Sequence, residues 1–240
     1  MNATSCTLAS LECGESVYGS AAEHVNWWLL VEHPGPWSAD ILDDPKLSPQ
    51  SRAALESALK ELGGARLQWI RRGERPLERP LRIFLAHNGE TQGLWSHSIP
   101  GLDALGTLDL VACAKAIASE GKPSDPWQPE THPLFLVCTH GRRDACCARY
   151  GSAFFRALST VDPTSAWQCS HIGGHRFAAC ALTLPGGHYF GRLLPEEAET
   201  FVKAYNEGKI FDLEKYRGNS KLGAKEQTAE CLWRQAQGYK

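Results

Sequence analysis

This sequence of 240 residues has little of three features that often reveal a function at once: charge of one sign, long hydrophobic runs and a targeting segment. Its formal charge of −2 provides no basic surface for nucleic acid. No apolar run approaches the ~20 residues that a membrane-spanning helix needs. The first thirty residues lack a charged start and an apolar core, and Glu12, Glu15 and Glu23 are unlike a transit peptide. We therefore expect a soluble cytoplasmic protein that binds neither nucleic acid nor a membrane.

Cysteine, in contrast, is frequent, with nine residues in the chain. Because we expect no secretory signal, a disulfide framework is less favoured than metal binding or redox chemistry. No two cysteines have the Cys-x-x-Cys spacing that is usual in thiol–disulfide oxidoreductases. Cys113 and Cys180 are each flanked by alanine on both sides, so we expect them to be small buried hydrophobic residues.

The chain is long enough for one large domain or two of ordinary size, and its 42% hydrophobic content is that of a globular protein. Residues 119–131 contain three prolines and a glycine, which predicts a linker. We therefore place two domains at 1–122 and 123–240. Since the candidate ligands described below all follow residue 126, the second domain alone is predicted to carry the site.

The two halves are predicted to share the order β-α-β-β-β-α. Strands are expected at 27–31, 67–70, 81–86 and 93–97 in the first half, and at 134–137, 166–169, 176–182 and 188–192 in the second. Helices are expected at 48–62, 105–119, 145–158 and 195–205, with one more at 224–237 after a turn at 217–220. A parallel strand pair joined through a helix, then a hairpin and a closing helix, is the order of a thioredoxin-like fold. We expect two thioredoxin-like halves, of which only the second kept a site.

A cysteine–histidine pattern in the second half carries most of the functional information. Cys138, Cys146 and Cys147 lie on one segment, and His171 and His175 follow about twenty residues later. Two thiols and two imidazoles from two glycine-bearing loops make a credible four-ligand metal site. The glycine pair at 173–174 makes a helix between the histidines improbable and favours a loop.

The surroundings of these cysteines favour thiolates. Cys138 is expected at the end of a strand, where open α/β sheets place their sites. The cysteine pair at 146–147 opens the next helix, whose dipole stabilises a thiolate, and Arg142 and Arg143 act in the same direction. Asp144 is expected to cap that helix, and His140 to support the site without binding the metal.

Two motifs resemble the sucrase/ferredoxin-like family of thioredoxin-like [2Fe–2S] proteins. They are Cys138-x-His-Gly-x-Arg-Asp-x-Cys-Cys147 and His171-x-Gly-Gly-His175-Arg-Phe-Ala178, with further matches at 189–196, 216–220 and 227–230. The resemblance implies a [2Fe–2S] cluster held by Cys138, Cys147, His171 and His175. Cys146 would then be the neighbour that binds no iron.

The implied ligand set favours electron transfer. Two thiolates and two neutral imidazoles leave an oxidised [2Fe–2S] core uncharged, so the reduction potential is higher than with four thiolates, as in Rieske centres. Imidazole N–H groups can also lose protons, which predicts proton-coupled electron transfer with a separate reductase and acceptor protein. Glycoside hydrolysis needs a pair of carboxylates, and nothing in the sequence marks one.

Two alternatives use the same residues. A structural zinc site of two cysteines and two histidines would be served equally well by this donor set. A thiol-based redox enzyme would use Cys138, Cys146 or Cys147 on the same scaffold, although the missing Cys-x-x-Cys spacing counts against it.

Overall fold

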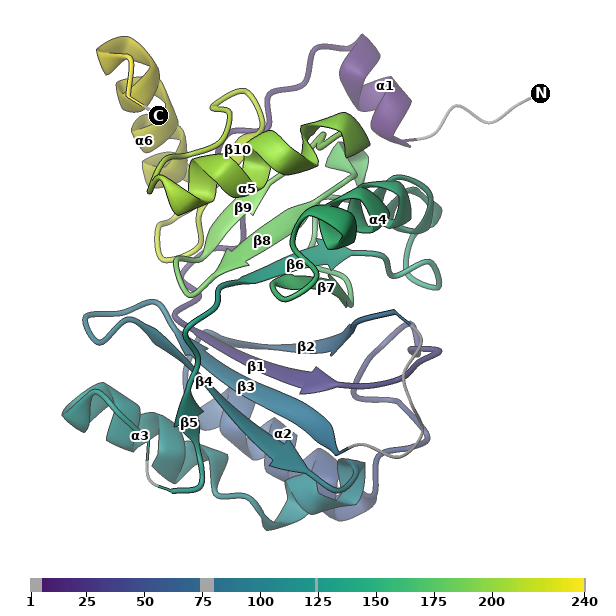
Figure 1. The fold of residues 1–240 in the computed structure, drawn as a ribbon, viewed down its shortest axis with the longest axis vertical. Helices are drawn as coiled ribbons and strands as arrows, with labels where there is room; N and C mark the ends of the chain where they lie inside the picture. Colours follow the sequence, from purple (N-terminus) through teal and green to yellow (C-terminus); the bar gives the residue numbers. More distant parts are fainter. Residues whose placement is uncertain (1–5, 74–79, 124, 240) are drawn as a thin grey trace.

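The computed structural model describes residues 6–73, 80–123 and 125–239, and its strands form one mixed sheet (Figure 1). The strand order is β10-β9-β8-β6-β7-β2-β1-β3-β4-β5. The strands β1 to β4 of the first half, together with β5, therefore occupy one side of the sheet, and the strands β6 to β10 of the second half occupy the other side. No helix in the described part of the chain has the length and apolar character needed to cross a bilayer.

The first half has a thioredoxin-like topology. Strand β1 pairs in parallel with β2 through the helix α2, β3 pairs antiparallel with β1, and β4 pairs antiparallel with β3. The helix α3 closes the unit after a short 3₁₀ helix, η1. The elements are β1 (Trp27–Glu32), α2 (Pro49–Glu61), β2 (Ala65–Arg71), β3 (Leu81–His87), β4 (Gly93–Ile99), η1 (Leu102–Thr107) and α3 (Leu110–Glu120).

The second half repeats this topology. Strand β6 pairs in parallel with β7 through α4, β8 pairs antiparallel with β6, and β9 pairs antiparallel with β8. The repeat agrees with the predicted pair of thioredoxin-like halves. The elements are β6 (Leu134–Cys138), α4 (Ser152–Val161), β7 (Ala166–Cys169), β8 (Ala181–Leu184), β9 (His188–Phe190), α5 (Ala198–Asn206), β10 (Tyr216–Asn219) and α6 (Ala224–Gln237).

The halves join through their equivalent edge strands. Strands β2 and β7 pair antiparallel, with Ile70 opposite Cys169. Just beyond that pair, the Ser170 N–H donates to the Trp69 carbonyl oxygen at 2.8 Å. Because each copy thereby covers the exposed edge of the other, the junction leaves neither edge strand unpaired.

Successive side chains of each strand point to opposite faces of the sheet, so buried clusters form on both faces. In β1, Trp27 and Leu29 pack with α2 and α3, whereas Trp28 and Leu30 face the opposite side. A third cluster packs the second half of the sheet against α4 and α5, which lie beside its strands in Figure 1. The opposite face spans the junction of the halves and is covered in part by residues 17–25, which contribute Val17, Ala21, Ala22 and Val25.

Three predicted elements of the second half differ from the structure. The strand expected at 176–182 begins only at Ala181, because His175–Phe177 forms the 3₁₀ helix η3. The turn expected at 217–220 is instead largely strand β10, which pairs with β9. The helix expected at 145–158 starts at Ala145 as predicted, but it contains a π-helical turn, η2 (Cys147–Gly151), before α4.

Two features of the chain near the predicted domain limits were not expected. The predicted linker at 119–131 contains the short strand β5 (Gln128–Pro129), which pairs with β4 of the first half. The helix α1 (Cys6–Glu12) packs against η3 of the second half. The division at residues 122 and 123 stays a prediction, with these two segments lying against the half to which it does not assign them.

Candidate metal centre

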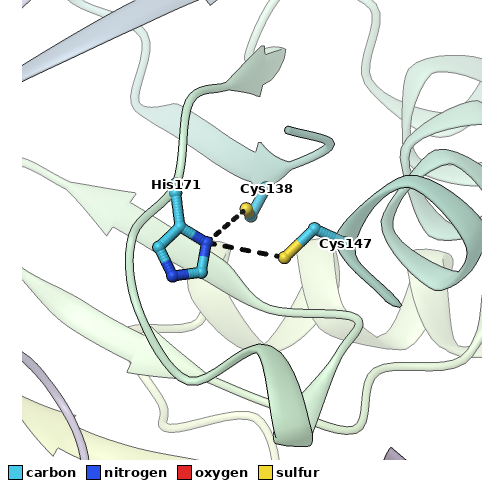
Figure 2. A group of neighbouring side chains, drawn as sticks. All are labelled: Cys138, Cys147 and His171. Atoms are coloured by element: carbon cyan, nitrogen blue, oxygen red, sulfur yellow. Dashed lines mark hydrogen bonds between the residues drawn. The ribbon is translucent and has the colours of Figure 1, made fainter. Parts of the chain in front are cut away.

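Three side chains converge at the end of β6 (Figure 2). Cys138 is the last residue of β6, Cys147 opens the π turn after it, and His171 follows β7. The His171 Nδ1 lies 3.8 Å from the Cys138 Sγ and 3.6 Å from the Cys147 Sγ. All three donor atoms lie within 4.8 Å of one another, and no other group of this kind occurs among the described residues.

The fourth predicted ligand, His175, lies beside this group rather than in it. Its ring centroid is 6.1 Å from that of His171, and its side chain is 41% exposed. Its Nε2 lies 3.8 Å from the Asp144 Oδ2. Cys146 is buried but does not belong to the convergent group, so the structure brings Cys147 and not Cys146 to His171.

Two features of the connection between β6 and α4 bring Cys138 and Cys147 together. The Asp144 Oδ1 accepts the Cys146 N–H at 2.8 Å and so caps the helix at its start, as expected. Gly151 lies against β6, where a Cβ atom would overlap the carbonyl oxygen of Cys138. Because glycine permits this close approach, the π turn can carry Cys147 to the end of the strand.

The histidine loop depends on its two glycines. Gly173 and Gly174 have φ values of +86° and +75°, which favour glycine over any other residue. The Cys180 thiol donates to the carbonyl oxygens of Gly174, at 3.2 Å, and Phe177, at 3.3 Å. Cys180 is buried as predicted, but it also fixes the loop that carries His175, and only the tertiary contacts reveal this second role.

The N-terminal segment also reaches this loop. The Thr7 hydroxyl donates to the His175 carbonyl oxygen at 3.3 Å, and the Arg176 Nε lies 2.6 Å from the Glu15 carboxylate. The hydrogen bond from Arg176 lowers the pKa of Glu15. These contacts join residues more than 160 positions apart, so no local pattern could have predicted them.

The pKa values of the Cys138 and Cys147 thiols are shifted in opposite directions. The hydrogen bond from Cys147, followed by that from His171, holds the pKa of the Cys138 thiol well below its usual range. The same hydrogen bond, together with burial, raises the pKa of Cys147. The pair therefore loses its first proton readily and retains its second. Arg142 and Arg143, expected to lower thiol pKa values, are exposed and do not cause the shift at Cys138.

Two buried groups flank the convergent thiols. Cys169 lies beside Cys138 on the neighbouring strand, and burial raises its pKa well above the ordinary thiol value. His140 accepts the His171 N–H at its Nδ1, at 3.3 Å, and burial lowers the pKa of its imidazole. Both groups are therefore uncharged at neutral pH, which agrees with the supporting role expected of His140.

A small cavity of about 190 Å³ opens beside His171. His140 and Arg143 line it from the second half, and Asp40, Ile41 and Gln68 from the first. The first half thus contributes part of the surface next to the candidate centre.

The position of the first half that is equivalent to Cys138 is occupied by a residue of another type. Glu32 ends β1 as Cys138 ends β6, and its carboxylate accepts the Arg82 N–H at 3.0 Å. The next residue, His33, is fully buried with its Nε2 3.4 Å from Asp44. Burial lowers the pKa of His33 despite the neighbouring carboxylate. No group of metal-ligand type was found here within the described residues.

Comparisons with known proteins show which proteins this chain resembles. Curated relatives named "Altered inheritance of mitochondria protein 32" include one from Meyerozyma guilliermondii, 29% identical over 101 residues, covering 38% of this chain and 36% of that protein. Another from Eremothecium gossypii is 32% identical over 106 residues, covering 38% and 34% respectively. The matches thus span about a third of these relatives' length.

Among solved structures, a cysteine-to-serine variant of the thioredoxin-like [2Fe-2S] ferredoxin from Aquifex aeolicus was found with a TM-score of 0.30 and 16% identity. The match covers 35% of this chain and 96% of that chain.

The predicted cytoplasmic location is contradicted by these comparisons. The curated relatives share a name that refers to the inheritance of mitochondria. The sequence argument had rested on the composition of the first thirty residues, and such a negative observation cannot establish a compartment. The family model described as sucrase/ferredoxin-like matches residues 17–218, and this chain therefore belongs to the sucrase/ferredoxin-like family.

Proposed function

We propose that this protein transfers electrons through a [2Fe–2S] cluster held by Cys138, Cys147, His171 and His175. The observation that carries the proposal is the convergence of two buried thiols on His171 in a chain of this family. The donor set fits in kind, because iron–sulfur clusters take cysteine thiolates and, in some centres, histidine imidazoles. When bound, the cluster would supply one-electron redox chemistry.

The candidate ligands differ in their exposure to solvent. Cys138 and Cys147 are each 1% exposed, so the sulfur side of the centre is shielded from water. His175 is partly exposed, with 41% of its side chain open to solvent, and its Nε2 faces the Asp144 carboxylate. Reductase and acceptor proteins would therefore approach from the imidazole side. The same exposure would let the His175 N–H exchange its proton with solvent, as proton-coupled transfer requires.

A second candidate is a mononuclear zinc site. The His171 Nδ1 lies at nearly equal distances, 3.8 and 3.6 Å, from the two sulfurs, as donors around one tetrahedral ion would. Thiol exchange is disfavoured, since both thiols are buried and attack on a protein disulfide requires access.

Metal analysis after anaerobic purification separates the candidates. Iron and acid-labile sulfide in equal amounts, a red-brown colour and an EPR signal after dithionite reduction would support the cluster. Stoichiometric zinc in a colourless protein would instead support the zinc site. Neither metal, with two free thiols at the site, would contradict both.

A further inference from the structure

Arg217 is a buried cation next to the histidine loop. Its residue is 2% exposed and lies in β10. No ion pair joins its guanidinium to a carboxylate of the described residues. Its charge instead meets neutral groups: the Ser20 hydroxyl and carbonyl, the Gly173 carbonyl, and the rings of Phe177 and Tyr189. A buried guanidinium without a counter-ion is costly, and a negative charge nearby would offset that cost.

The guanidinium is placed against the loop itself. The Arg217 Nη1 donates to the Gly173 carbonyl oxygen at 3.1 Å, and a Cβ atom at Gly174 would overlap the guanidinium. Together with Ile172, these two glycines are the residues that lie between His171 and His175. The geometry of the loop therefore depends on the position of Arg217.

The guanidinium is in turn anchored from the N-terminal segment. Its Nε donates to the Ser20 hydroxyl at 3.0 Å, Nη2 donates to the Ser20 carbonyl, and the Ser20 N–H donates back to the Arg217 carbonyl at 3.2 Å. Two of these hydrogen bonds hold the guanidinium and the third holds its backbone, which leaves the planar fork little freedom. Its remaining donor edge is directed toward the glycine pair.

We infer that Arg217 is the positioning residue of the candidate metal centre. It holds the glycine pair between the histidines, and it places a fixed positive charge behind them that favours the reduced state. The second part rests on the proposed electron-transfer function, because each electron accepted adds one negative charge to the centre. A charge held in low dielectric acts more strongly than one in water.

Two variants of Arg217 separate charge from geometry. Both remove the planar guanidinium fork, but R217Q also removes the positive charge, whereas R217K retains it. R142Q is the matched control, since it removes an exposed guanidinium from the loop between the two cysteines, where water screens its charge.

The first measurement is the midpoint potential of the iron-loaded proteins. We expect R217Q to shift the equilibrium at least tenfold toward the oxidised state, which is a potential about 59 mV lower for one electron. R217K and R142Q should change it by less than threefold. A potential of R217Q equal to that of the wild type would overturn the charge role.

The second measurement is hydrogen exchange of the metal-free full chain. The Phe177 and Ala178 amides donate to the carbonyls of Gly174 and His175, so their exchange reports on the loop. Both Arg217 variants should exchange these amides at least tenfold faster, and R142Q should not. Unchanged exchange in R217Q would overturn the positioning role.

The two measurements also distinguish a failure of this inference from a failure of the proposed function. Wild-type protein that carries zinc and no iron would refute electron transfer and the charge role, while hydrogen exchange would still decide the positioning role. If R217Q does not fold, S20A tests the positioning role, because it removes the hydroxyl that accepts from the Arg217 Nε and leaves the charge. Wild-type exchange in S20A would then count against the inference.

Discussion

At the scale of single residues, the candidate centre is asymmetric. Both thiols lie in the buried cluster on the junction face of the sheet, whereas His175 is partly exposed to solvent. Removal of a thiol therefore opens a buried apolar surface, and removal of His175 changes a partly hydrated edge. Substitutions at the cysteines should consequently be the most informative about the cofactor.

We expect C138S and C147S to lower bound iron at least roughly tenfold, because even weaker outer-shell changes have effects of that size. A serine hydroxyl at neutral pH is a poor substitute for a thiolate. The control is C146S, which changes a buried cysteine outside the convergent group and should retain iron. Iron and sulfide assays decide between them. Loss of iron in C146S but not in C147S would reverse the assignment within the pair.

Another residue-scale prediction concerns His188 and acid stability. Burial, with smaller effects of Arg234 and Lys221, lowers the pKa of His188 to about 4. The unfolded chain binds this proton near pH 6.5, so the free energy of unfolding should fall as the pH decreases from about 6.5 to about 4 and then level off. The contribution of His188 is up to about 3 kcal/mol.

Urea unfolding between pH 4 and 7 measures this contribution. H188N keeps a polar side chain beside the Tyr216 hydroxyl, which lies 3.1 Å from the His188 Nδ1, and should flatten the decline. The exposed His132 is the matched control, because H132N should leave the decline unchanged. Equal slopes for the wild type and H188N would show that His188 titrates normally in the folded state.

At the scale of elements, the decisive unit is the strand–helix connection from β6 to α4. The predicted helix start at residue 145 was correct because Asp144 is a strong local capping signal. The π turn after it was not predicted, since it results from the packing of Gly151 on the Cys138 carbonyl. The position of Cys147 thus depends on a contact across the connection.

G151A should disturb this connection. The added methyl group overlaps the Cys138 carbonyl, and overpacking of this kind costs about 1–3 kcal/mol. We expect both a lower free energy of unfolding and a weaker metal affinity. Gly101, around which a Cβ atom would meet nothing within 4 Å, is the control position, and G101A should be close to neutral. A G151A protein with wild-type stability and metal content would show that the close approach is unnecessary.

At the scale of the whole molecule, the two halves are connected by more than the β2–β7 junction. The N-terminal segment crosses to the second half, where the Val25 N–H donates to the Ser220 carbonyl and the Ala21 N–H to the Gln227 side chain. This segment also supplies Ser20 to Arg217. All four candidate ligands follow residue 126, yet their supports include residues that precede β1.

A fragment from residue 126 should therefore carry the donors but hold metal poorly, which revises the expectation that the second domain is sufficient. Deletion of residues 1–25 removes hydrogen bonds to the charged Arg217 that contribute about 1.5–3 kcal/mol each. The deletion variant should unfold at lower urea and lose metal faster in chelator competition. A synthetic peptide of residues 1–25 added in trans should restore part of the affinity. Wild-type retention by the fragment would contradict a supporting role for this segment.

Sequence alone determined the order β-α-β-β-β-α in each half and the kinds of donor atoms in the second. Both are local properties: hydrophobic periodicity specifies strands and helices, and thiols and imidazoles are recognisable by residue type. Family membership followed from motifs of the same kind and was confirmed by the match over residues 17–218. The liganding roles of Cys138, Cys147, His171 and His175 stay a prediction.

Only the tertiary structure decided which groups surround those donors. Strand β10 looks like a turn in the sequence because its glycine and asparagine favour turns, and it becomes a strand by pairing with β9. Arg217 and Ser20 lie 197 positions apart, and no pattern in the sequence relates them. Contacts of this range depend on the packing of the whole chain, since the free energy that holds them comes from burial and not from local conformational preference.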